Sequence, residues 1–165
     1  MSESARFLER LDAVCARLRA QSMREIAPNA LTAPDPSTGE QWQAGQVWAH
    51  LAEFIPYWIG EARTVIAAAA ARQFGRTKTD AGRVAAIERD RHAGRAVLWA
   101  RVDRDLSTLR EFLDSLDDAA WRAEGVHPTL GAMAMPRIVD EFLIGHLEQH
   151  ADQLDALAST PVDPD

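Results

Sequence analysis

The sequence predicts an all-α protein built as a four-helix bundle. Alanine, leucine, arginine and glutamate, which favour helices, are abundant, whereas β-branched residues are sparse. Apolar residues recur at helical spacing in four segments, and the alternation of apolar and polar residues that marks a strand is hard to find. Four amphipathic helices without strands are typical of a four-helix bundle.

The length of the chain suits one domain of ordinary size. It has 165 residues, of which 47% are hydrophobic and 26% are charged, as in a soluble globular protein. We expect a single helical-bundle domain over residues 1–160. A short C-terminal tail with Pro161 and Pro164 should follow over residues 161–165.

The first helix is predicted from about Ser4 to Met23. Its apolar stripe consists of Phe7, Leu8, Leu11, Val14, Cys15 and Leu18. Residues 24–41 are rich in Pro, Asn, Thr, Ser and Gly and are predicted to form a loop. A loop of this length inside a compact domain often has a function.

The second helix is predicted from about Ala44 to Gln73. Pro56 lies within it, and because proline removes one backbone hydrogen bond we expect a kink nearby. A polar connection should run from Gly75 to about Arg83. The buried side of this helix is predicted to comprise Val47, Leu51, Phe54, Ile55, Trp58, Ala62, Val65 and Ile66.

Two further helices complete the predicted bundle. The third should run from about Val84 to Leu113, followed by a turn and a short helix ending at Trp121. Residues 124–134 are predicted to be a loop. The fourth helix should begin near Pro136, a residue suited to a first helical turn, and continue to about Leu157.

The charge balance argues against a non-specific nucleic-acid binder. The formal net charge is -7, whereas such proteins need a basic face. Arginines cluster around residues 83–110, but acidic residues are interleaved there. This pattern indicates a solvated helix face, with a phosphate-binding patch as the alternative.

Other features of the chain suggest a cytoplasmic protein without a membrane partner. The N-terminus lacks the basic and apolar regions of a signal peptide. The most apolar stretch, around Val65–Ala71, is too short to span a bilayer. Cys15 is the only cysteine, so no internal disulfide can form, and its place on an apolar stripe predicts a small core residue.

Three histidines fall on predicted apolar stripes. His146 and His150 are four residues apart, so their rings share one side of the fourth helix with Leu143 and Leu147. His50 lies on the core-facing side of the second helix. The sequence therefore predicts that the three rings converge inside the bundle.

Burial of three imidazoles is costly unless their polar atoms find partners. One divalent metal ion would satisfy all three, since neutral imidazole binds zinc, nickel and iron. Three protein ligands with open positions suit a catalytic site. The alternative for each ring is an ordinary hydrogen bond to a neighbour. Neither His92, which should be exposed, nor His127, which should be exposed or overhang the site, is predicted to be a ligand.

Two segments resemble the DinB/YfiT-like metal-binding superfamily. In that superfamily, a Trp at the start of the second helix is followed eight residues later by a ligand His. In QWQAGQVWAHLAEF (residues 41–54), Trp42 precedes His50 by the same spacing. The last helix of the superfamily carries two ligand histidines as HxxxH, often with a Gln soon after. DEFLIGHLEQHADQL (residues 140–154) matches this pattern with His146, His150 and Gln153. The order and spacing of the helices also agree, so the resemblance covers most of the chain.

This resemblance implies a DinB-like four-helix bundle in which His50, His146 and His150 bind a divalent metal, commonly zinc or nickel. It also implies a homodimer. Related proteins, mycothiol-dependent maleylpyruvate isomerase and bacillithiol S-transferase, use the metal to activate a low-molecular-weight thiol. A small-molecule electrophile and a thiol such as mycothiol or bacillithiol are therefore the expected partners.

The leading functional hypothesis is a metal-dependent transferase or isomerase that activates such a thiol. The alternatives are a hydrolase that uses metal-activated water, and a metal-stabilised binding or stress-response module without turnover. Glu53 is the candidate catalytic residue, because it is one turn from His50 and could orient a ligand or accept a proton; otherwise it is a solvated carboxylate. Tyr57 and Trp48 either line the pocket or serve packing, and Trp42 should anchor the entry to its helix in the core.

Overall fold

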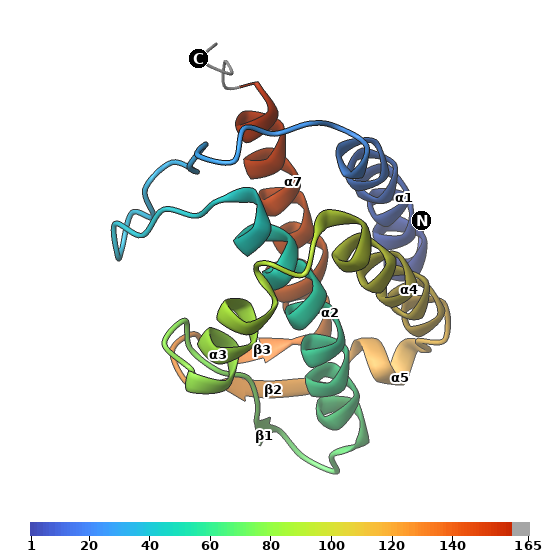
Figure 1. Ribbon diagram of the computed structural model, residues 1–165. Helices are drawn as coiled ribbons and strands as arrows, with labels where there is room; N and C mark the ends of the chain where they lie inside the picture. Colours follow the sequence, from blue (N-terminus) through green and yellow to red (C-terminus); the bar gives the residue numbers. More distant parts are fainter. Residues whose placement is uncertain (160–165) are drawn as a thin grey trace.

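The computed structural model describes residues 1–159 and confirms the all-α class, with four long helical segments packed as a bundle (Figure 1). The tail predicted over residues 161–165 lies outside the described residues. A small sheet at one end of the bundle is an addition to the prediction. The long segments are α1 (Glu3–Ser22), α2 (Ala44–Ala67), α4 (Arg95–Asp114) and the run formed by α6 (Met135–Val139), η1 (Asp140–Ile144) and α7 (Gly145–Ala158).

Helix α1 begins and ends close to the predicted residues. The Ser2 hydroxyl accepts a hydrogen bond from the backbone N–H of Ala5 at 3.2 Å and so caps the N-terminus. Cys15 is only half-buried, and burial raises the pKa of its thiol to about 11. It is therefore a packing residue at the edge of the core and stays protonated at neutral pH.

Helix α2 is shorter than predicted. It continues through Pro56, which is exposed, but it ends at Ala67, six residues before the predicted end at Gln73. The chain leaves the helix there because Arg72–Gln73 forms strand β1, which pairs in parallel with a strand from much later in the sequence. At the other end, the side chain of Gln46 accepts a hydrogen bond from the backbone N–H of Gln43 at 2.9 Å.

The third predicted helix is wrong as a single element. The structure divides it into α3 (Ala81–Asp90) and α4, with Gly94 between them at a φ of 87°. This left-handed conformation suits glycine and breaks the helix. The break allows α3 to pack across α2, where Gly45 lies against the backbone of Arg91.

The prediction of a loop over residues 124–134 is also wrong. Strands β2 (Glu124–His127) and β3 (Gly131–Ala134) form an antiparallel hairpin, and β1 completes a three-stranded sheet in the order β1-β2-β3. The short helix predicted before it is present as α5 (Asp118–Trp121). Strands of two to four residues carry too little alternation to be recognised, and their pairing with β1 is non-local.

The last helical segment contains a π-helical turn, η1, immediately before the predicted histidine pair. Pro136 lies in the first turn of α6, as predicted. At Gly145, an added Cβ would lie 2.6 Å from the carbonyl oxygen of Asp140, so the wider turn needs a residue without a side chain there. The π turn therefore sets the register in which α7 faces the bundle.

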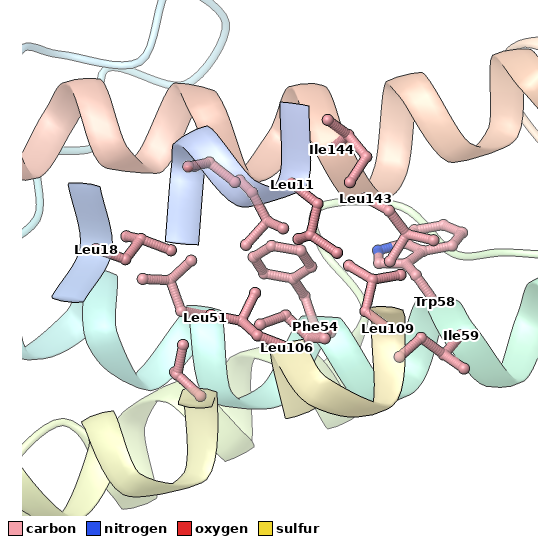
Figure 2. Close-up of a cluster of buried hydrophobic side chains, with 14 of the residues drawn as sticks. Leu11, Leu18, Leu51, Phe54, Trp58, Ile59, Leu106, Leu109, Leu143 and Ile144 are labelled. Atoms are coloured by element: carbon pink, nitrogen blue, oxygen red, sulfur yellow. The ribbon is translucent and has the colours of Figure 1, made fainter. Parts of the chain in front are cut away.

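The core lies where the long segments meet. Figure 2 shows side chains from α1, α2, α4 and η1 pointing toward one another, which confirms the predicted apolar stripes. In the arginine-rich stretch, Arg89 and Arg101 both pair with Asp90, as expected for a face with interleaved acids. Among residues 1–159, no helix is both long and apolar enough to cross a membrane.

Substitution of Gly45 tests the crossing of α2 and α3. A Cβ at Gly45 would lie 2.3 Å from the Arg91 carbonyl oxygen, so Gly45→Ala should reduce the free energy of unfolding by about 1–3 kcal/mol. Gly60→Ala is the matched control on the same helix, because nothing lies within 4 Å of its Cβ position. Chemical denaturation should show that Gly60→Ala leaves stability unchanged or raises it. Equal effects would contradict this packing.

Candidate metal centre

The structure brings the three predicted histidines together between α2 and α7. The Nε2 atom of His146 lies 3.1 Å from Nε2 of His50 and 3.1 Å from Nε2 of His150. One ligand nitrogen from each ring lies within 4.8 Å of the other two. His50 and His150 are buried and His146 is half-buried, so the cluster approaches solvent on the side of His146.

In His50 and His150, the second ring nitrogen, Nδ1, is hydrogen-bonded to a side chain one turn further along the same helix. Nδ1 of His50 lies 3.1 Å from a carboxylate oxygen of Glu53, and Nδ1 of His150 lies 2.7 Å from the amide oxygen of Gln153. Since both oxygens are acceptors, both Nδ1 atoms carry the proton. The Nε2 lone pairs of His50 and His150 therefore face Nε2 of His146, which has at most one proton to donate.

Burial keeps the three rings neutral. It lowers the pKa of His50 and His146 well below the ordinary value of 6.5, and that of His150 to about 4. Repulsion among the rings and the positive charge of Arg83 add to this effect at His50 and His146, whereas a hydrogen bond with Gln153 opposes it at His150. Neutral imidazole is the form that binds a metal ion.

The spacing of the His146 nitrogen from the other two nitrogens fits a small divalent cation. Ligands about 2.1 Å from an ion are separated by about 3.0 Å at right angles and by about 3.4 Å in a tetrahedron. The 3.1 Å separations of the His146 pairs lie in this range. The cluster also contains at least one lone pair without a donor, which a cation would satisfy.

Glu53 is not the solvated carboxylate of the alternative prediction. Its side chain is only 8% exposed, and its two oxygens lie 2.6 Å from a guanidinium nitrogen of Arg76 while one also accepts from His50. Charge pairing with Arg76 keeps Glu53 a hydrogen-bond acceptor for His50. Glu53 therefore orients the ring, as a carboxylate does behind many metal-binding histidines.

Arg76 is a residue that the sequence did not single out. Its guanidinium carbon lies 3.7 Å above the centre of the Tyr57 ring, so Arg76 is held between Tyr57 and Glu53. Burial raises the pKa of Tyr57 to about 12 and keeps the phenol protonated. Arg76 belongs to the polar connection after α2, and only the folding of that segment back over the helix reveals its position.

Aromatic rings enclose the cluster. Trp42 stacks on His150 at 6.2 Å between ring centres and meets His50 edge-on at 5.3 Å, while Phe54 lies 4.7 Å from His146. Trp42 is buried at the entry to α2, as predicted, and it also forms a wall of the site. Trp48 is a core residue that packs edge-on against Trp99 at 6.0 Å.

The other two histidines lie outside the cluster. His92 is exposed, as expected. His127 is buried, which neither prediction for it anticipated, and both of its ring nitrogens have partners: Nε2 donates to the carbonyl oxygen of Arg76 at 3.2 Å, and Nδ1 accepts from the Thr129 hydroxyl at 3.1 Å. His127 therefore anchors the backbone of Arg76 to β2.

This fold is already known among solved structures. The chain is similar to YfiT from Bacillus subtilis, which is described as a probable metal-dependent hydrolase with an unusual four-helix bundle topology. The two share 16% sequence identity with a TM-score of 0.74, and the match covers 96% of this chain and 88% of YfiT. No protein-family model matches the chain. No curated protein matches it either.

The buried histidines predict acid sensitivity of the metal-free protein. The unfolded chain binds protons at these rings near pH 6.5, whereas folded His150 binds one only near pH 4, so stability is complete above pH 6.5 and is lost as pH falls through this window. The loss at His150 alone should be on the order of 3 kcal/mol. Denaturant titration from pH 7 to pH 4 would measure it.

A His150→Gln variant should show a shallower dependence on pH over this window, because one buried titrating ring is removed. His92→Gln is the control, since His92 is exposed. Equal slopes in the wild type and in His150→Gln would count against the pKa shift.

Proposed function

We propose that this protein binds one divalent metal ion through Nε2 of His50, His146 and His150. The ion would activate a low-molecular-weight thiol, either for transfer of the thiol to an electrophile or for a thiol-dependent isomerisation. The observation that carries the proposal is the convergence of three neutral imidazole nitrogens, two of them fixed by Glu53 and Gln153. Zinc and nickel suit this set of nitrogen ligands best, and iron is also compatible with it.

When bound, such an ion would lower the pKa of a coordinated thiol or water and so supply the nucleophile. His146 is only half-buried, so a further ligand would reach the ion from its side of the cluster. Trp42 and Phe54 flank the rings and limit the access of water there.

The chain's own residues favour a thiol. Both oxygens of Glu53 are engaged by Arg76, and one also accepts from His50, so this carboxylate is poorly placed to take a proton from water. A thiol coordinated to a metal is deprotonated outright, whereas metal-bound water titrates near neutral pH and gains more from a nearby base. The thiol must come from a separate molecule, because Cys15 lies on α1 and burial raises its pKa to about 11.

Hydrolysis is the second candidate. It is supported by the likeness of the fold to YfiT, which is described as a probable metal-dependent hydrolase. The same three histidines would bind the ion in either reaction. A metal-stabilised module without turnover is the third reading, and homodimerisation stays a prediction of the sequence resemblance.

Metal content is the first test. Purified protein should retain about one equivalent of transition metal after dialysis, measured by elemental analysis. His50→Ala, His146→Ala and His150→Ala should each reduce the retained metal to a small fraction, because two imidazoles hold an ion far less tightly than three. His92→Ala, at an exposed histidine, should retain the metal. Full metal content in all three cluster variants would exclude this site.

Removal of the charge on Glu53 tests its orienting role. Glu53→Gln should weaken metal affinity by about 10- to 100-fold, since the carboxylate both orients His50 and strengthens it as a ligand. Competition with a chromogenic chelator would measure the change. Glu88→Gln is the control, because Glu88 is exposed and pairs with Arg91 on α3. An affinity unchanged in Glu53→Gln would limit Glu53 to a packing role.

The reaction is tested on the metal-loaded protein. Incubation with mycothiol, bacillithiol or glutathione and a panel of electrophiles should give a conjugate or isomer whose formation stops when the metal is chelated. Turnover of esters or amides without any thiol would instead favour hydrolysis. Tight metal binding with neither reaction would support the module without turnover.

A further inference from the structure

Three cationic residues lie near the histidine cluster, two in the segment between α2 and α3 and one in the first turn of α3. Arg76 pairs with Glu53 at 2.6 Å, and Lys78 pairs with Asp35 at 2.7 Å. Arg83 differs from both, because within residues 1–159 its guanidinium forms no ion pair with a carboxylate. Only the carbonyl oxygen of Lys78 accepts a hydrogen bond from it, at 2.8 Å.

Arg83 is also withdrawn from water. The residue is half-buried, and burial lowers the pKa of its guanidinium. A charge that has lost part of its hydration without a directly paired carboxylate is costly to the fold. The arginine-rich stretch was expected to be a solvated face, and Arg83 departs from that expectation. A negatively charged ligand would offset this cost.

The guanidinium of Arg83 lies beside the histidine cluster. Its carbon is 5.4 Å from the centre of the Trp42 ring, and the same ring contacts His50 and stacks on His150. The positive charge of Arg83 lowers the pKa of all three histidines. The Trp42 ring thus contacts both Arg83 and two histidines of the proposed metal centre.

Arg83 is held in place before any ligand arrives. Its backbone N–H donates to a carboxylate oxygen of Asp80 at 2.9 Å at the start of α3, and its side chain donates to the Lys78 carbonyl. A guanidinium offers five N–H donors, so most remain available. Such a positioned planar group binds a carboxylate through two parallel hydrogen bonds with little loss of entropy.

We propose that Arg83 binds a carboxylate of the molecule that ligates the metal, so that the substrate or thiol of this protein is an anion. The proposal rests on the proposed metal centre. A carboxylate fits better than a phosphate, because a single unpaired cation offers one positive charge. The negative charges of Glu53, Glu40 and Asp35 also act on Arg83, and they would repel a dianion more strongly than a single carboxylate.

The test uses cobalt(II)-loaded protein and two small thiols of similar size, 3-mercaptopropionate and 2-mercaptoethanol. Thiolate binding is read from the absorption band that it produces with cobalt. The wild type should prefer the carboxylate-bearing thiol by about tenfold, the effect of one charge-assisted contact. Arg83→Gln should bring the two affinities to within about twofold, and Arg83→Lys should keep part of the preference.

Arg19→Gln is the matched control, because Arg19 is an exposed arginine on α1 that pairs with Asp103 at 3.4 Å. It should retain the full preference. Thermal unfolding and cobalt content of each variant confirm that the fold and the site are intact. The comparison is repeated without a thiol by measuring the affinities of acetate and acetamide from shifts of the cobalt absorption bands.

The outcomes separate the two proposals. An equal preference in the wild type and in Arg83→Gln, with either pair of probes, would overturn the role of Arg83 and leave the metal site standing. Failure of both thiols to bind, with a loss of acetate affinity in Arg83→Gln, would support Arg83 and contradict the thiol reaction. Absence of cobalt from the wild type would remove both proposals.

Discussion

The burial of three imidazole rings in an apolar core is the constraint on which the rest of the site depends. His50 and His150 are almost fully enclosed, and their lone pairs face His146 at 3.1 Å. A neutral cluster of this kind leaves a lone pair without a donor, which is unfavourable in a medium of low polarity. Each surrounding feature either fixes the direction of these rings or excludes water from them.

Support for the rings comes from segments that are distant in the sequence. His127 on β2 holds the backbone of Arg76, Arg76 pairs with Glu53, and Glu53 accepts from His50. The small sheet contributes here, because β1 leads into the loop that carries Arg76 and pairs with the strand that carries His127. Second partners of this kind set both the orientation and the basicity of a metal ligand.

The π-helical turn before α7 makes a separate contribution. It inserts a wider turn between Pro136 and the histidine pair, and Gly145 tolerates it because no side chain meets the carbonyl of Asp140. Such turns are frequent at functional sites, since they rotate the following residues relative to the preceding helix. His146 and His150 reach His50 in the register that follows this turn. The cluster is thus set by backbone geometry as well as by the four-residue spacing.

Local patterns determined the helices, the core stripes and the three histidines, because helical periodicity and the position of a polar residue on an apolar face can be read from adjacent residues. Gly94 in its left-handed turn, the short strands and the places of Arg76, Arg83 and His127 were decided only by the tertiary structure. The strands and these side chains depend on contacts between segments far apart in the chain, such as β1 with β2 or Arg76 with Glu53. The sequence alone therefore identified the candidate ligands, whereas folding decided which residues hold them and which cation is left unpaired beside them.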